Sequence, residues 1–185
     1  MTSLDQLFVQ AFCLQPILIS RIKAWALASG GYLCCSQPGG ALEYVRFGAR
    51  EGVDFRWGKL KSVNRAIEKA IRCHGQDVSR LLDVCRQMIA FDGFSDLSAC
   101  LGLMASDPHV QILRVKNRLD PDYDSSVSGG YRDVNVNLRI RSPAAALVGA
   151  DSHVCEVQLL LRGMALLKSD EGHRNYVSSR NLRGD

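Results

Sequence analysis

The chain has 185 residues, of which 46% are hydrophobic. This length suits one domain with a full core and is too short for two comfortable ones. The 23 basic and 19 acidic residues leave a net charge of +4, so the composition fits a polyphosphate ligand as well as RNA. We find neither an uninterrupted apolar run of about 18 residues nor the charged start of a signal peptide, and therefore expect a soluble, cytoplasmic protein.

The seven cysteines form no Cys-x-x-Cys pair and no zinc-ligand spacing with histidine. An odd number of scattered thiols argues against a disulfide framework and favours a reducing compartment. We expect most of them to be small core residues.

The first third of the chain has one clear element, a helix predicted over residues 3–29. Pro16 is expected to interrupt it, and Gly30-Gly31 to end it. Residues 31–58 contain several glycines and no sustained period, which predicts a loop with one short helix over 42–47.

The rest of the chain predicts an alternation of helices and strands. An amphipathic helix over 59–73 has an apolar face, and Lys61, Arg65 and Lys69 lie near its other face. Strands and helices are expected after it at 84–91 (strand), 94–105 (helix), 110–115 (strand), 133–140 (strand), 153–159 (strand) and from 162 past Lys168 (helix). This order predicts an α/β (α+β) fold with a mixed β-sheet and flanking helices, in which residues 1–58 are an N-terminal extension and 59–185 the main domain.

Polar groups gather at the ends of two of these strands. Gly130 permits a tight turn, and Tyr131, Arg132 and Asp133 then follow at the mouth of an alternating strand, which suits a flat ring that carries phosphates. Glu156 lies inside an otherwise apolar strand, where an unpaired charge would cost several kcal/mol, so a cation is expected beside it. The alternative is that Arg132 or Asp133 simply pairs with Glu156 or with a residue of a neighbouring strand.

Two carboxylates and a set of cations point to phosphate chemistry. Asp83 precedes one strand and Glu156 lies on another, so the pair could converge on Mg²⁺, which prefers oxygen ligands; structural salt bridges are the competing interpretation. Phosphoryl-type transfer needs positive charge more than covalent chemistry. Six residues could supply that charge: Lys59, Lys61, Arg65 and Lys69 on the predicted helix, with Arg86 and Lys116 on strands. The sequence has no Walker-type phosphate loop.

These segments resemble the RelA/SpoT-like nucleotidyltransferase domain of alarmone synthetases. The resemblance depends on Gly130-Tyr131-Arg132 opening a strand, on Glu156-Val157-Gln158 in the next strand, and on a late Gly172-His173 with Tyr176. It extends upstream to Lys59 and so covers roughly two thirds of the chain.

The resemblance implies a role for each matching residue. Lys59, Lys61 and Lys69 would bind the phosphates of ATP, and Asp83 would be a Mg²⁺ ligand. Tyr131 would stack on the base of the acceptor nucleotide, with Arg132 and His173 on the acceptor side. Glu156 would bind the metal and help to activate the acceptor 3′-hydroxyl.

The sequence also departs from the family pattern. Arg65 replaces a usual serine, Arg86 a frequent glycine, and Asn117 the aspartate of the Arg-x-Lys-Asp motif, while Leu160-Leu161 replace Arg-Thr. We therefore expect a divergent member that transfers pyrophosphate from ATP to the 3′-hydroxyl of a guanine nucleotide (GDP or GTP) or another acceptor such as an RNA end. A catalytically degenerate nucleotide sensor or interaction module is the alternative, and a small RNA-binding domain a third possibility.

Overall fold

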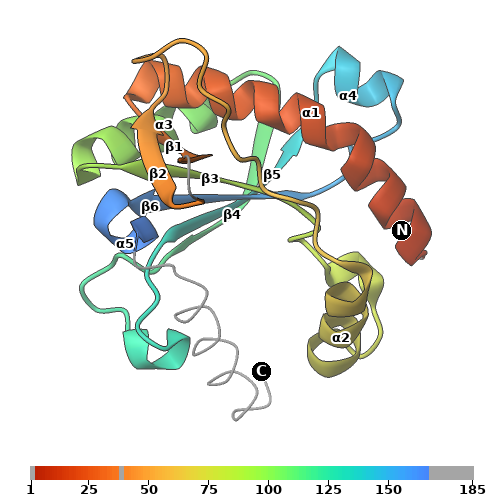
Figure 1. Cartoon of the computed structure of the whole chain (residues 1–185). Coiled ribbons are helices and arrows are strands. Elements are labelled where there is room, and N and C mark those ends of the chain that lie inside the picture. The colour runs from red at the N-terminus through yellow and green to blue at the C-terminus, as the bar shows by residue number, and fades with distance from the viewer. Residues whose placement is uncertain (1–2, 38–39, 167–185) are drawn as a thin grey trace.

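The structure is a computed structural model that describes residues 3–37 and 40–166. A six-stranded mixed sheet in the order β2-β1-β3-β6-β5-β4 forms its centre, which confirms the predicted fold class (Figure 1). Only β3 and β6 run parallel. The strands are β1 (Tyr32–Ser36), β2 (Leu42–Arg46), β3 (Cys85–Phe91), β4 (Val110–Asn117), β5 (Val134–Ile140) and β6 (Cys155–Leu161), and the helices are α1 (Leu4–Ser29), α2 (Val63–His74), α3 (Phe94–Ser106), α4 (Pro143–Leu147) and α5 (Arg162–Leu166), with short 3₁₀ turns η1 (Val78–Arg80) and η2 (Ser125–Ser128).

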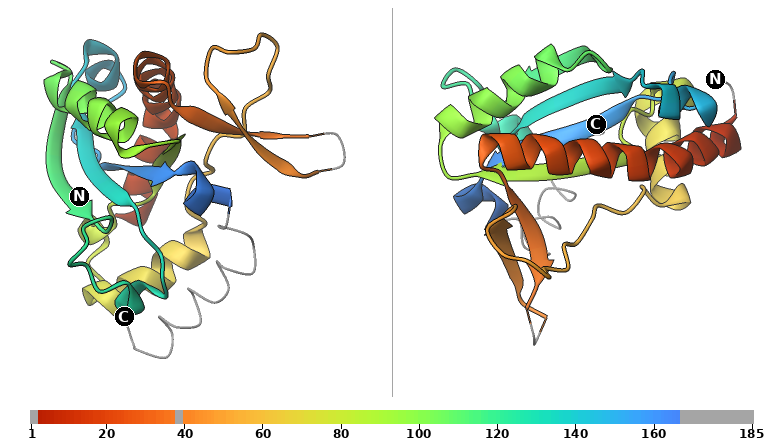
Figure 2. Two further views of the ribbon diagram at one scale, coloured as in Figure 1. Left: turned by 90° about the vertical axis from the view of Figure 1, so that its left-hand side faces the viewer. Right: turned by 90° about the horizontal axis from the view of Figure 1, so that it is seen from above.

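Helices α1 and α3 cover one face of the sheet, and α2 and η2 lie on the other side (Figures 1 and 2). The core is the layer between α1, α3 and the sheet, where strand residues of alternate positions such as Ile89, Val136 and Val157 are fully buried. The opposite face of the same strands carries Arg86, Asn135 and Glu156 at the intervening positions, because successive strand residues point to opposite faces. The fold therefore presents a polar sheet face toward α2 and η2.

Helix α1 is continuous from Leu4 to Ser29, so the predicted interruption at Pro16 is wrong. Pro16 lies on the exposed side, where water can satisfy the carbonyl that loses its helical partner. By length and mean hydropathy (1.3) α1 could cross a membrane, contrary to our expectation, but its buried stripe, which includes Leu14, Leu18 and Ile22, packs in the core. Gly30 ends the helix with a left-handed φ of 69°, as its sequence predicts.

Residues 31–58 are not the loop that the sequence predicts. They contain the antiparallel hairpin of β1 and β2, and β2 occupies the place of the expected short helix. Each strand has five residues, too few for a clear alternation, and pairing with the edge of the sheet decides their conformation. The first 58 residues thus add two strands to the same sheet and a helix to its core. The division of the chain at residue 58 stays a prediction.

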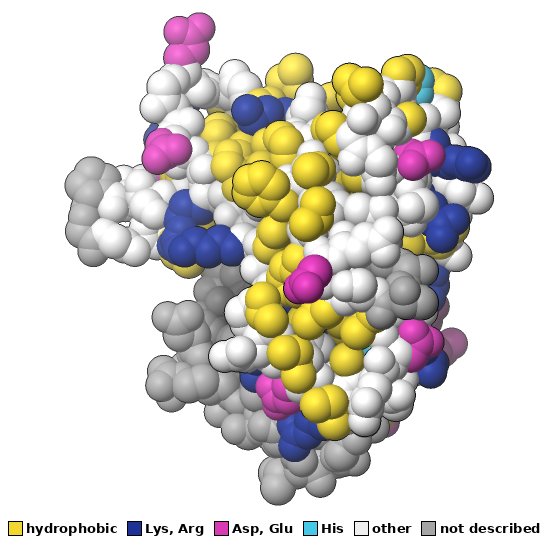
Figure 3. All heavy atoms as spheres, turned by 90° about the vertical axis from the view of Figure 1, so that its right-hand side faces the viewer, with side chains coloured by type: hydrophobic (Ala, Val, Ile, Leu, Met, Phe, Trp, Pro, Cys, Tyr) yellow, Lys and Arg dark blue, Asp and Glu magenta, His cyan; other side chains and the backbone are white. Residues whose placement is uncertain are grey.

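Helix α2 is shorter than predicted. Ser62 caps it and accepts a hydrogen bond from the Arg65 amide, so Lys59 and Lys61 lie in the extended segment before the helix. Only Ala66 and Ala70 are buried. Three residues of its apolar face are exposed: Val63 by 49%, Ile67 by 42% and Ile71 by 58%. Figure 3 shows hydrophobic side chains gathered in a band down the face formed by α4, the start of α1 and α2.

All seven cysteines are free, as the sequence predicts. Cys85, Cys100 and Cys155 are buried in the core.

Candidate functional site

Asp83 lies two residues before β3 and is 7% exposed. Its Oδ2 atom accepts from the Nζ of Lys61 at 2.5 Å and lies 3.1 Å from the Nζ of Lys69. Burial opposes ionisation of this carboxyl, but the two ammonium groups prevail and hold its pKa below the ordinary value. Its other oxygen, Oδ1, is buried and has no hydrogen-bond partner among the described residues. Asp83 is therefore an ionised carboxylate with one oxygen still available to a cation or a donor.

Glu156 occupies the second position of β6 on the polar sheet face. Burial raises its pKa, a hydrogen bond from Asn135 opposes the shift, and the Asp83 carboxylate raises the pKa further. The Gln158 amide donates to Glu156 Oε1 at 3.0 Å. Arg132 bonds backbone carbonyls, and Asp133 pairs with Arg118 just after the neighbouring strand β4, so the alternative of an ion pair is confirmed for Asp133, with Arg118 and not Glu156 as its partner.

Asp83 and Glu156 lie close enough for one charge to change the pKa of the other, although 73 residues separate them in the sequence. Parallel pairing of β3 with β6 brings this about, because it places Arg86 in register with Glu156 and the start of each strand at one end of the sheet. Lys69 and Arg86 lower the pKa of Glu156 from the same side. Two carboxylates and three or more cations thus share one end of the polar face.

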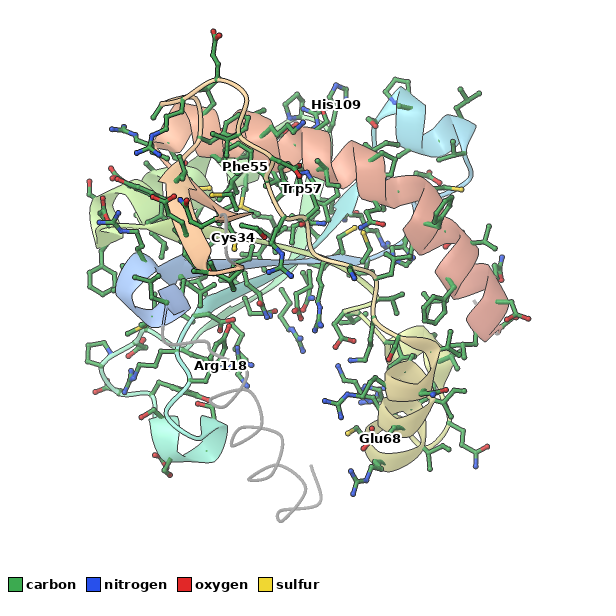
Figure 4. The ribbon with its side chains drawn as sticks, in the orientation of Figure 1. Cys34, Phe55, Trp57, Glu68, His109 and Arg118 are labelled. Carbon is green, nitrogen blue, oxygen red and sulfur yellow. The ribbon has the colours of Figure 1, made fainter. Side chains whose placement is uncertain are left out.

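The other predicted cations that have not yet been placed are Lys59, Arg65 and Lys116, and they lie on different elements. Lys59 is exposed in the segment before α2, and Arg65 is half-exposed and 3.5 Å from Glu68 on the outside of that helix. Lys116 lies on β4 in register with Asn135, which itself bonds Glu156. Figure 4 shows Glu68 on α2 and Arg118 on the η2 side, on opposite sides beneath the sheet.

Tyr131 lies near Glu156, whose charge helps to raise the pKa of the phenol, although burial is the larger cause. Its ring packs against the small apolar cluster of Ala90, Leu160 and Ala165. The Arg132 guanidinium donates to three backbone carbonyls of residues 118–123 and so holds the loop before η2. His173, the last predicted site residue, lies outside the described residues.

Three polar residues that were not predicted as site residues lie on the same sheet face as Glu156. Asn135 bonds Glu156, Gln158 donates to it, and Asn137 accepts from Arg114 at 3.0 Å. Asn135 and Asn137 are buried at every second position of β5. The signal was present in the alternation of polar residues at 135, 137 and 139, which is unusual in a central strand.

Two surface hollows of the described residues lie away from these carboxylates. One of about 350 Å³ lies under residues 47–57 beside Lys23, and one of about 600 Å³ lies between α1, His109 and the start of α4. Neither includes Asp83, Glu156 or Tyr131. Within the described residues no group of three or more His, Cys, Asp or Glu side chains could hold a metal ion, so a metal here would need water or substrate oxygens beside the two carboxylates.

Comparison with solved structures identifies the fold. The small alarmone synthetase 1 of Bacillus subtilis, bound to its product pppGpp, matches with a TM-score of 0.51 and 17% identity over 65% of this chain and 60% of that one. The chain has the fold of a small alarmone synthetase. The Type VI effector Tas1, in complex with its immunity protein, matches with a TM-score of 0.56 and 15% identity over 96% of this chain and 73% of that one. The protein smu.1046c of Streptococcus mutans gives a TM-score of 0.51 and 15% identity, over 74% of this chain and 65% of that one.

The alarmone-synthetase fold is thus shared at low sequence identity, and the chain spans about three fifths of the Bacillus subtilis synthetase. No model of a known protein family and no curated protein matches the sequence.

Proposed function

We propose that this protein is a Mg²⁺-dependent pyrophosphokinase that transfers pyrophosphate from ATP to the 3′-hydroxyl of a guanine nucleotide or of another acceptor such as an RNA end. The observation that carries the proposal is the convergence of Asp83 and Glu156 beside Lys61, Lys69 and Arg86. Buried carboxylates next to several cations suit a reaction in which charge on phosphates must be balanced while a hydroxyl loses a proton.

The chemistry follows from the state of each carboxylate. The acceptor 3′-oxygen attacks the β-phosphorus of ATP, the bond from that phosphorus to the α–β bridging oxygen breaks, and AMP leaves. Glu156 accepts the hydroxyl proton, and its raised pKa brings it closer to the value that a general base needs near neutral pH. Lys61 and Lys69 bind the donor phosphates, with Lys116 further along the sheet, and stabilise the charge that develops there.

The residues present fit a divalent metal. Asp83 has a buried carboxylate oxygen without a hydrogen-bond partner, and Glu156 shares its surroundings. These two side chains would hold Mg²⁺, which keeps several waters and binds substrate phosphates. When bound, the ion supplies charge stabilisation at the phosphoryl oxygens.

The acceptor is proposed to bind at the η2 side. Tyr131 provides an aromatic ring beside Glu156, and Arg132 and His173 are assigned to acceptor phosphates by the resemblance. Lys59, Arg65 and Arg86 would bind further phosphate oxygens. The pppGpp product of the Bacillus subtilis synthetase supports a guanine nucleotide as acceptor. A reaction on soluble nucleotides also fits a location in the cytoplasm.

A nucleotide sensor without turnover is the second candidate, and two substitutions favour it. Asn117, in place of the family aspartate, accepts from the Leu119 amide at 3.0 Å and so serves the turn after β4. Leu160, in place of an arginine, is fully buried under Tyr131 and offers no charge.

The two candidates differ in one experiment. The purified protein is incubated with Mg²⁺, γ-labelled ATP and GDP, GTP, AMP, ADP or a short RNA, and products are separated by thin-layer chromatography. Label on one acceptor establishes the pyrophosphokinase and names its substrate. Nucleotide binding without transfer would assign the sensor, and failure to bind any nucleotide would reject both.

A further inference from the structure

Asp133 is fully buried, with an exposed fraction of 0%, although it follows directly after the Gly130-Tyr131-Arg132 segment. Both oxygens of its carboxylate are bonded. Oδ1 lies 2.5 Å from Nη1 of Arg118, and Oδ2 accepts from the Tyr131 hydroxyl at 3.0 Å. Its backbone carbonyl also accepts from the Arg118 amide at 2.8 Å. A buried carboxylate persists only where its charge is matched, and Arg118 matches it here.

Two further contacts hold Tyr131 in place. The Arg118 guanidinium lies over that ring, 5.9 Å from its centroid, and the Ser128 hydroxyl donates to the Tyr131 carbonyl at 2.6 Å. The tyrosine is therefore held by its hydroxyl, by a cation over its ring and by its backbone. A change of the Tyr131 side chain to another χ1 rotamer would break the hydrogen bond to Asp133 and the contact with Arg118 at once.

This arrangement limits what Tyr131 can offer a ligand. Its hydroxyl donates to Asp133, so a flat ligand would meet Tyr131 through the part of its side chain that stays partly exposed, not through the hydroxyl. Burial raises the pKa of the phenol, which keeps the hydroxyl protonated as the donor that Asp133 requires. Arg118 is likewise balanced by Asp133, which separates it in role from cations such as Lys61 and Lys69 beside Asp83.

We propose that Asp133, through Arg118 and the Tyr131 hydroxyl, is a positioning residue that fixes the Tyr131 ring as a stacking surface for the acceptor base. The inference rests on the proposed function, and it adds that acceptor affinity depends on a buried acid that contacts no substrate. We call Asp133, Arg118 and the Tyr131 hydroxyl together the clamp. Affinity for the donor ATP depends on Lys61 and Lys69 and is independent of the clamp. A ring fixed before binding pays less conformational entropy when a base stacks on it.

The test compares binding of GDP with binding of α,β-methylene ATP by isothermal titration calorimetry in the presence of Mg²⁺. The variants are Asp133→Asn, Tyr131→Phe and the double variant. Asp107→Asn is the matched control, because Asp107 is a carboxylate of 9% side-chain exposure paired with Arg21 at 3.1 Å on the other side of the sheet. Thermal unfolding and far-UV circular dichroism establish that each variant folds.

Loss of a hydrogen bond to a charged group predicts a Kd for GDP about tenfold higher in Asp133→Asn and several-fold higher in Tyr131→Phe, with the Kd for the ATP analogue unchanged in both. The double variant is expected to have the same Kd for GDP as Asp133→Asn, because both changes affect the same hydrogen bond between Tyr131 and Asp133. Asp107→Asn should lower the unfolding midpoint and leave the ratio of the two Kd values, for GDP and for the ATP analogue, unchanged.

The proposal is overturned if folded Asp133→Asn and Tyr131→Phe bind GDP as the wild type does, or if both ligands weaken equally. If Asp133→Asn does not fold, Tyr131→Phe decides alone, since it removes only the hydroxyl, and unchanged GDP binding then rejects the clamp. Wild-type protein that binds neither ligand would instead reject the proposed function, and the ligand role of the clamp with it.

Discussion

The ammonium of Lys69 lies 3.1 Å from the carboxylate of Asp83, and this ion pair joins α2 to the segment just before β3. Apart from it and the Lys61 pair, α2 buries only two alanines. The helix is thus held in place largely by the charges that the proposed chemistry requires, so its position and the charge of Asp83 depend on one another.

Replacement of Lys69 by methionine should loosen this connection. The change leaves Asp83 with one ammonium in place of two, so we expect the free energy of unfolding to fall by about 1–2 kcal/mol, less than for removal of a fully buried partner. The affinity for ATP should fall while that for GDP is retained. Chemical denaturation and calorimetry measure the two effects. Arg72→Met, which removes a half-exposed partner of Glu68 on the same helix, is the control and should change neither by much.

The pH dependence of activity should report Glu156. Its pKa is raised above 4.5 by burial, and the proposed base must be ionised, so kcat/KM should fall as the pH drops through this raised value. Asp83, whose pKa is lowered, stays ionised over the same range. A pH–rate profile for the wild type measures the shift, and an acidic limb at or below the ordinary glutamate value would contradict the assignment.

The same shift predicts a stability effect of opposite sign to the usual one for acids. A folded-state pKa above the unfolded value means that Glu156 stabilises the fold when protonated and loses that contribution as the pH rises through the folded-state value. Glu156→Gln should therefore gain stability relative to the wild type as the pH rises above the ordinary glutamate value of 4.5. Urea titrations at several pH values measure this, and a difference independent of pH would contradict it.

Gly58 should tolerate no larger residue. The Gln87 side chain accepts from its amide at 2.9 Å and donates to its carbonyl at 3.1 Å, and a Cβ at this position would lie 2.6 Å from the carbonyl oxygen of Arg86. We expect Gly58→Ala to cost about 1–3 kcal/mol and to displace the segment that carries Lys61. Gly102→Ala is the control, because a Cβ there meets nothing within 4 Å. Equal stability of the two variants would show that residue 58 is not restrained as described.

Two isoleucines should differ sharply in what they contribute. Ile89 is fully buried in β3, whereas Ile71 on α2 is 58% exposed. Truncation to alanine should cost about 2–5 kcal/mol at position 89 and under about 0.5 kcal/mol at position 71. Thermal unfolding of the two variants measures the difference. A large loss at Ile71 would mean that the stripe on α2 is covered in solution.

The sequence predicted the mixed sheet, and it did so where local pattern was strong. Strand β3, whose second half is apolar and buried, and α1, with its buried stripe, followed from local pattern. The hairpin of β1 and β2 did not, since five-residue strands depend on the partner strand rather than on local preference. For α2, periodicity indicated an apolar face but could not say whether a neighbour covers it, and Val63, Ile67 and Ile71 are exposed.

Of the candidate site, the sequence predicted the two carboxylates better than the residues that surround them. Asp83 and Glu156 were paired from strand ends and from the family resemblance, and their proximity depends on the parallel pairing of β3 with β6, which local sequence does not specify. Pairing of Asp133 with a residue of a neighbouring strand was one of the sequence-based alternatives, but the sequence did not name Arg118 as its partner. Long-range side-chain pairs of this kind leave no spacing signal in the chain.

The most direct test of this account measures transfer of labelled pyrophosphate by the wild type, Asp83→Asn and Glu156→Gln side by side, with nucleotide binding measured for each. We predict that both variants bind nucleotide and lose transfer by at least about a hundredfold, as expected for removal of a proton acceptor or of a charge-stabilising group. Full transfer by Glu156→Gln would contradict the account.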